Sequence, residues 1–207
     1  MPSNELHIDG QLKELQLRVS HHDESAFTQL YVHYSKKLIL FAHSLVRSKE
    51  TAEEVVEDVF VKLWGGRQKL PEIQNLTVYL YVAVKNSALN KLSRKAHDLV
   101  AAPFDDLDTT IDEFAADPYD LLISSEMMAR MHQAIEALPP RCKMIFKLIR
   151  EDGLKYKEVA EILNISVNTI DVQMAIAVKK ISQSLQIEKP GKPTPQHYSQ
   201  DSALKKN

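Results

Sequence analysis

The spacing of the apolar residues is the feature that most constrains what this chain can fold into. Almost everywhere along its 207 residues, apolar side chains recur at intervals of three and four, and strand-like alternation is nearly absent. One such stripe, from Phe27 to Leu45, covers one face of a helix expected at 24–47. The sequence therefore predicts an all-α protein.

Polar residues predict where the helices of the first half begin. Asp23 can cap the helix 24–47, and Asn75 can cap a long helix at about 77–97. The run from Thr51 to Glu54 has the pattern of a capping box that opens a helix ending near Trp64. A shorter helix at about 12–20 is expected before these, so the first domain is predicted to span 1–97.

The composition changes after this first domain. Between Leu99 and Arg130 there are eight acidic residues and one cation, and the part up to residue 118 has no convincing apolar period. The segment 98–118 is therefore expected to be an acidic linker, either a solvated tether or a segment that occupies a basic groove. A second helical domain is predicted at 119–188, followed by a polar tail, 189–207, expected to be disordered.

The second domain contains a candidate helix-turn-helix at 156–182. Pro139-Pro140 can start a helix that ends before Gly153, and a helix at 156–163 is separated from a last helix by a three-residue turn. The last helix has a buried-type stripe of Val167, Ile170, Met174, Ala177 and Ile181. This pattern is typical of a DNA-binding helix-turn-helix, although a helical hairpin in a bundle would show the same stripe.

The last helix is poor in positive charge. At 100° per residue its outer face is expected to hold Asn168, Val172, Ala175, Ile176 and Lys179, with Thr169 at the margin. Asn168 and Thr169 can hydrogen-bond bases or phosphates near the helix start, whereas Val172 and Ile176 offer only apolar contact. An exposed valine–isoleucine pair would equally suit a protein interface.

Two further surfaces stand out in the first domain. The helix 51–64 combines acidic residues with more apolar residues than one stripe needs, which suits a partner interface, or simply an amphipathic helix with acids near its start. The segment 67–97 has six cations and one acid, with Tyr79 and Tyr81 beside Asn86 and Asn90. Cations among aromatic and amide side chains suit single-stranded nucleic acid, although core tyrosines on a helix with a basic end would look similar.

Other function classes lack their signatures. The net charge of −2 means that any nucleic-acid binding must rest on local patches. The single cysteine, Cys142, fits a buried structural thiol in a reducing compartment, and neither a signal peptide nor an apolar run of spanning length is found. No metal-binding or nucleotide-binding motif is present. We therefore expect a cytoplasmic protein that is not an enzyme and has no cofactor, no metal and no small-molecule substrate.

Taken together, these segments resemble the sigma-70 superfamily, specifically the compact extracytoplasmic function (ECF) sigma factors. AFTQLYVHYSKKLILFAHSLV and TAEEVVEDVFVKLW are similar to the first two conserved segments of sigma domain 2, and YLYVAVKNSALNKLSRK to its promoter-melting and minus-ten segment. ALPPRCKMIFKLIREDGLKYKEVAEILNISVNTIDVQMAIAVKKI resembles domain 4. The resemblance covers about 12–97 and 121–187.

The resemblance implies an initiation factor that binds core RNA polymerase and directs it to promoters. It assigns core polymerase binding to Glu54, Asp58, Phe60, Leu63 and Trp64, and minus-ten DNA binding to Tyr79, Lys85, Asn86, Asn90, Lys91 and Arg94. Asn86 falls where the family captures a flipped-out base of the non-template strand, and Tyr79 where it usually has tryptophan. The linker would run through the basic channels of the polymerase. Such proteins are commonly inhibited by an anti-sigma factor, which makes one a candidate partner here.

The minus-thirty-five residues implied by the resemblance depart from the family. They are Ser166, Asn168, Thr169, Asp171, Val172, Gln173, Ile176 and Lys179. Many relatives have a cation and serine in place of Asp171 and Val172, and arginine in place of Gln173 or Ile176. Because several phosphate contacts are missing, we expect weak DNA binding by the free protein and a preference for an A/T-rich upstream element.

Two other hypotheses fit part of the pattern. A free-standing helix-turn-helix regulator would bind duplex DNA without polymerase, at a two-fold symmetric site. A pure interaction protein would use Val172 and Ile176 to bind another protein and would protect no DNA. The acidic-apolar helix 51–64 and the basic segment 67–97 argue against the free-standing regulator.

Overall fold

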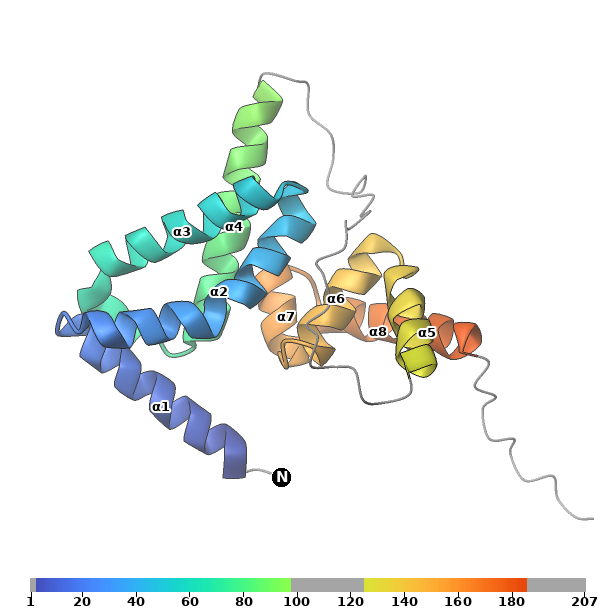
Figure 1. Ribbon diagram of the computed structural model, residues 1–207, viewed down its shortest axis with the longest axis horizontal. Coiled ribbons are helices and arrows are strands. Elements are labelled where there is room, and N and C mark those ends of the chain that lie inside the picture. The colour runs from blue at the N-terminus through green and yellow to red at the C-terminus, as the bar shows by residue number, and fades with distance from the viewer. Residues whose placement is uncertain (1–2, 98–124, 186–207) are drawn as a thin grey trace, which may run out of the picture.

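A computed structural model describes residues 3–97 and 125–185, and all regular structure in these two ranges is helical (Figure 1). The elements are α1 (Ser3–Ser20), α2 (Glu24–Val46), α3 (Lys49–Gly65), the 3-10 helix η1 (Arg67–Glu72), α4 (Leu76–His97), α5 (Ser125–Glu136), α6 (Pro140–Arg150), α7 (Tyr156–Leu163) and α8 (Val167–Ser184). The all-α prediction is confirmed. The linker 98–118 and the tail 189–207 lie outside the described residues.

Side-chain caps begin three of the helices in the first half. The carboxylate of Asp23 accepts a hydrogen bond from the amide of Ala26 at 2.9 Å, and the Asn75 side chain accepts one from the amide of Val78 at 3.0 Å. Both predicted caps are therefore confirmed. The predicted capping box at Thr51 is wrong, because α3 begins two residues earlier with Ser48 as its cap.

The reason for this earlier start lies in the turn before α3. Arg47 ends α2 in the left-handed conformation, with φ of 58°, which turns the chain sharply. Ser48 is then extended, and its hydroxyl accepts a hydrogen bond from the amide of Thr51 at 3.2 Å. Serine in this geometry satisfies a free amide of the first turn, so the helix can begin before Thr51.

The first bundle is built on α2, α3 and α4, which contact one another in pairs. Their fully buried side chains include Leu30, Leu38, Val55, Leu80 and Val84. Helix α1 packs on α2 and on η1. The buried amide of Gln16 in α1 donates to the carbonyl oxygens of Leu70 and Ile73 at 2.7 and 3.0 Å, so it satisfies backbone acceptors at the end of η1.

The second bundle contains α5 to α8. Pro140 occupies the first turn of α6, where its missing amide hydrogen costs nothing. Asn164 ends α7 in the left-handed conformation, and Ser166 caps α8, so the predicted turn between these helices is confirmed. Gly153 lies between α6 and α7 with φ of 77°, a conformation that glycine adopts without strain.

The two bundles are docked on each other rather than separate. Helix α4 of the first bundle contacts α7 of the second, and buried residues of both belong to one continuous apolar cluster (Figure 1). A smaller cluster of Ala134, Leu138, Cys142, Ala177 and Ile181 joins α5 and α6 to α8. The position of α8 is therefore fixed by α5, α6 and α7 together.

Ion pairs of Glu136 with two lysines connect α5 to α6. The carboxylate of Glu136 accepts hydrogen bonds from Lys143 at 3.1 Å and from Lys147 at 2.7 Å, and the Lys143 side chain is only 5% exposed. Burial by itself would raise the pKa of Glu136, but the two lysines outweigh it and hold that pKa below its usual value. The charged form of Glu136 is therefore favoured in the folded state.

We expect Glu136→Gln to destabilise the protein by about 2 kcal/mol at neutral pH, because it leaves the buried Lys143 ammonium without its counter-charge. Since the folded-state pKa is lowered, this stabilisation is complete above the unfolded-state pKa and is lost as the pH falls through the folded-state value. Urea unfolding at several pH values measures it. The difference between wild type and variant should shrink in acid, and Glu161→Gln, an exposed position on α7, is the control.

Candidate nucleic-acid and partner interfaces

One face of α4 is polar and open to solvent. Asn86, Asn90 and Arg94 are exposed, and Tyr79 is 45% exposed. Steps of seven, four and four residues bring these four side chains to one face of the helix. The opposite face, with Leu80, Val84 and Ala88, is buried in the first bundle. The structure thus gathers most of the predicted minus-ten residues on one accessible surface.

The two tyrosines of α4 have different environments. Tyr79 is available at the surface, whereas Tyr81 is only 1% exposed and packs against Phe41, with ring centroids 5.1 Å apart. Its hydroxyl donates to the Asp152 carboxylate of the second bundle at 2.6 Å. Tyr81 is therefore a core residue and an inter-bundle contact, and Tyr79 alone of the two can stack on a base.

Lys91 lies between the two surfaces predicted for the first domain. Its ammonium forms ion pairs with the carboxylates of Glu54 and of Asp58, the second at 3.4 Å, and both acids belong to α3. Burial alone would lower the pKa of Lys91, but the hydrogen bonds and charges of these acids raise it above its ordinary value. A predicted nucleic-acid contact and two predicted partner contacts are therefore joined in one cluster. Lys85 is half-buried, and burial lowers its pKa.

The predicted partner residues of α3 do not all reach the surface. Glu54 is exposed and Asp58 is partly exposed, but Phe60 and Leu63 are 2% and 4% exposed and belong to the bundle core. Phe60 and Leu63 face the core because α2 covers the side of α3 on which they lie, and their assignment as polymerase contacts stays a prediction. Val61 of α3, which is 71% exposed, is an open apolar side chain of this helix. Sequence spacing alone gave no sign of it.

Trp64, the single tryptophan of the chain, is held by a cluster at the end of α3. Its ring lies 4.9 Å from that of Phe27, and the guanidinium of Arg67 lies over it at 4.7 Å. Arg67 also donates to the Trp64 carbonyl oxygen at 2.8 Å and contacts the imidazole of His22. No sequence pattern indicates this role of Arg67 and His22, because it depends on the fold of η1 and of the α1–α2 turn.

We expect Arg67→Ala to shift the tryptophan fluorescence maximum to the red, because it removes the group that covers one face of the indole. A surface cation–π contact of this kind is worth about 0.5–1 kcal/mol, so unfolding should change little. Emission spectra of the native protein measure the shift. Lys69→Ala, an exposed cation of the same segment, should leave the spectrum unchanged. An unchanged spectrum for Arg67→Ala would contradict this arrangement.

The start of α8 is ordered by its own side chains. The hydroxyl of Ser166 accepts from the amide of Thr169 at 3.0 Å and lies 2.8 Å from the Thr169 hydroxyl. Asn168, Asp171, Val172 and Lys179 are exposed, with Val172 at 50%, and Thr169 and Gln173 are half-buried. The Ser166 side chain therefore caps α8, and its predicted DNA contact would compete with that role.

Ile176 was expected on the outer face of α8, and the structure corrects this. Its side chain is half-buried against the cluster formed by α5, α6 and α8. A single amphipathic stripe would leave it exposed, but α5 packs on a second side of α8. Val178 is the exposed apolar residue at this end of the helix. The proposed valine–isoleucine interface is therefore not a continuous exposed pair.

The described residues show no sign of a metal site or a reactive thiol. No cluster of three or more metal-ligating side chains occurs in 3–97 or 125–185. Cys142 is buried, its thiol donates to the Gln173 carbonyl oxygen at 3.2 Å, and burial raises its pKa. None of the helices described is both long and apolar enough to cross a bilayer.

Comparison with family models gives two matches in the order of the two bundles. The model for Sigma-70 region 2 matches residues 30–97, and the model for Sigma-70, region 4 matches residues 128–181. Together they cover more than half of the chain. The first match contains the polar face of α4 and the Glu54–Asp58–Lys91 cluster, and the second contains α6, α7 and nearly all of α8.

Individual proteins agree with this assignment. The chain is 26% identical over 175 residues to the ECF RNA polymerase sigma-E factor of Escherichia coli K12, a match that covers 82% of this chain and 91% of that protein. It is 25% identical over 185 residues to the RNA polymerase sigma-H factor of Pseudomonas aeruginosa PAO1, covering 86% and 94%.

Two solved structures have the same fold. The sigma factor RpoE of Bartonella quintana, crystallised with the anti-sigma factor NepR, matches with a TM-score of 0.55 at 20% identity, over 79% of this chain and 98% of that one. CnrH, in complex with the cytosolic domain of CnrY, matches with a TM-score of 0.51 at 18% identity, over 86% and 99%.

Proposed function

The chain belongs to the sigma-70 family, and we propose from this premise that it is an ECF-type initiation factor that binds core RNA polymerase and directs it to promoters. The observation that carries the proposal is the order of a region 2 and a region 4 on one chain, each a folded helical bundle with an exposed polar helix face. We propose no catalytic role for the chain itself.

We propose that the first bundle binds polymerase through α3. Glu54 and Asp58 offer carboxylates to a basic partner, and Trp64 offers an aromatic surface at the end of the same helix. Phe60 and Leu63 support this surface from inside the bundle. Val61, seven residues from Glu54 and on the same helix face, adds exposed apolar area, as in an interface with an apolar core and a charged rim.

The polar face of α4 is proposed to hold the unpaired minus-ten strand. The exposed side-chain amide of Asn86 has both a donor and an acceptor, so it can hydrogen-bond a base edge. Tyr79 provides a ring for stacking. Arg94 and Asn90 follow along the same face, where they can contact the backbone. Lys91 adds positive charge at the edge shared with α3.

The start of α8 is proposed to lie in the major groove of an upstream minus-thirty-five element. Asn168 is exposed there, beside a helix N-terminus that favours phosphate, and Val172 can contact thymine methyl groups. The exposed carboxylate of Asp171 opposes DNA binding. The polymerase must then supply most of the affinity for promoter DNA.

The free-standing regulator is not the function of this chain, because a region 2 precedes the helix-turn-helix. An anti-sigma factor is proposed as a further partner, since both structural relatives were solved with a bound partner, NepR being described as an anti-sigma factor. Both relatives have the fold of this chain.

We expect Asn86→Ala to lower run-off transcription by core bacterial RNA polymerase about tenfold, because one lost base contact costs about 1–3 kcal/mol. Trp64→Ala should weaken transcription by lowering the affinity for polymerase instead. Competition binding to core polymerase separates the two effects. Gln11→Ala, an exposed amide on α1, is the control for Asn86 and should be as active as wild type.

Restoring a cation to α8 should strengthen DNA binding. Asp171→Lys removes a repelling charge and adds a phosphate contact, so the holoenzyme should bind promoter DNA more tightly at low salt. The slope of log affinity against log salt should become steeper by about one to two units. Filter binding across a salt series measures it. An unchanged slope would mean that α8 does not approach the DNA backbone.

A further inference from the structure

One lysine of α4 is held by two acids that remain open to solvent. Lys91 forms ion pairs with the carboxylates of Glu54 and Asp58, which lie one turn apart on α3, and the second pair measures 3.4 Å. The Lys91 side chain is 20% exposed, whereas those of Glu54 and Asp58 are 64% and 49% exposed. The cation is therefore covered more than either acid, and both acids can still accept a hydrogen bond from a partner.

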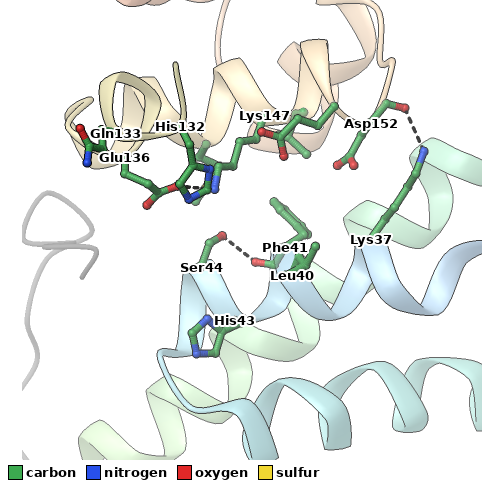
Figure 2. A pocket seen from close by; sticks show the side chains of 13 residues that line it. Lys37, Leu40, Phe41, His43, Ser44, His132, Gln133, Glu136, Lys147 and Asp152 are labelled. Atoms are coloured by element: carbon green, nitrogen blue, oxygen red, sulfur yellow. Dashed lines mark hydrogen bonds and ion pairs between the residues drawn. The ribbon is translucent and has the colours of Figure 1, made fainter. Parts of the chain in front are cut away.

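The ion pairs of Glu136 have the opposite arrangement. There the acid is the shared group, and Lys143 and Lys147 converge on it at 3.1 and 2.7 Å. Figure 2 shows Glu136 and Lys147 pointing toward each other at the edge of a cleft of about 400 Å³ between α2 and α5–α6. Because the Lys143 side chain is only 5% exposed, breaking this cluster leaves a buried charge unpaired. The acids that hold Lys91 are open to solvent and can change partners without that cost.

The packing of α3 on α4 does not depend on the ion pairs of Lys91. Four side chains that are 0% exposed supply the contact from the two helices, Val55 and Val56 from α3 and Val84 and Ala88 from α4. Water and salt screen pairs of partly exposed charges, so such pairs add little to apolar packing. Loss of the Lys91 pairs should therefore leave the two helices in place.

Lys91 also lies beside the polar face of α4. It follows Asn90 directly and is three residues before Arg94, about 60° from it around the helix. Figure 1 shows this end of α4 extending beyond α2 and α3. A lysine has a long, flexible stem, so its ammonium can turn from the acids of α3 toward a nucleic-acid backbone that follows Asn90 and Arg94. It cannot neutralise the acids and a phosphate in full at the same time.

We propose that Lys91 is exchanged between the two surfaces: a basic side chain of core polymerase takes its place on Glu54 and Asp58, and the released ammonium binds a phosphate of the minus-ten strand. This inference rests on the proposed sigma function and deepens it, because it makes the two contacts of the first bundle depend on each other. Coupling between two binding sites is reciprocal, so a DNA strand that holds Lys91 also strengthens binding to polymerase. In the absence of DNA, Lys91 competes with polymerase for the acids.

Lys91→Met tests the exchange, because it keeps an apolar stem and removes the charge. The affinity of the full chain for core polymerase, measured without DNA, should rise about two- to tenfold, since the acids lose a competitor. The holoenzyme should bind promoter DNA with a single-stranded minus-ten segment less tightly. Its slope of log affinity against log salt should become shallower by about 0.7, the value for one contact to a single strand. One substitution thus changes the two affinities in opposite directions.

Arg94→Met is the matched control, because it removes one exposed cation from the same helix and changes the net charge equally. It should weaken DNA binding in the same way and leave the affinity for polymerase unchanged. A general effect of charge would instead raise the affinity for polymerase in both variants and would overturn the exchange. Lys91→Arg keeps the charge and should restore both affinities.

A lysine that only supports the packing of α3 on α4 gives a different result. Lys91→Met would then lower the urea midpoint of unfolding and leave the affinity for polymerase at or below that of wild type, which would overturn the exchange. With both acids neutralised, as Glu54→Gln and Asp58→Asn, adding Lys91→Met should no longer raise that affinity. Failure of the wild-type chain to bind core polymerase would overturn the proposed function instead.

Discussion

The packing of α4 on two sides is the constraint on which the rest of the structure depends. One face of this helix supplies Leu80 and Val84 to the core of the first bundle, and Tyr81 extends the same core to the second bundle. The remaining face is left to solvent, with Tyr79 and Asn86 on it. Because a helix cannot rotate without withdrawing its buried residues from the core, the direction of this polar face is set by apolar packing. The same packing sets which part of the second bundle lies beside it.

Cations and acids are mixed on both proposed DNA-binding surfaces. The chain has a net charge of −2, and Lys91 of α4 is paired with Glu54 and Asp58. On α8, Asp171 opposes the attraction of Lys179. A cation of a partner that approaches the acids of α3 would compete with Lys91 for them and so make its ammonium more available to phosphate. We expect this mixed charge to limit binding to DNA outside promoters, so that specificity depends on the polymerase.

The helical periods, the caps at Asp23 and Asn75 and the turn at Asn164 were predictable from sequence, because each depends on neighbours within four residues. The capping box at Thr51 was wrong for a local reason, because Ser48 caps α3 first. The other differences from expectation depend on contacts between distant segments. Phe60 and Leu63 lie inside because α2 covers them, and Ile176 is half-buried because α5 packs on a second side of α8. Two contacts likewise join residues whose proximity no local sequence pattern predicts. They are the cation–π contact of Arg67 with Trp64 and the Tyr81–Asp152 hydrogen bond. The family resemblance named the surfaces but could not distinguish a residue that forms a surface from one that supports it.

The most direct test of the account is a hydroxyl-radical footprint of promoter DNA with core polymerase and this protein. We expect protection of two segments about 25 base pairs apart, with a reactive, unpaired strand at the downstream one, only when polymerase and protein are both present. Neither component alone should give this pattern. Strong protection by the free protein of a single symmetric site, unchanged by polymerase, would contradict the account and restore the helix-turn-helix as an independent regulator.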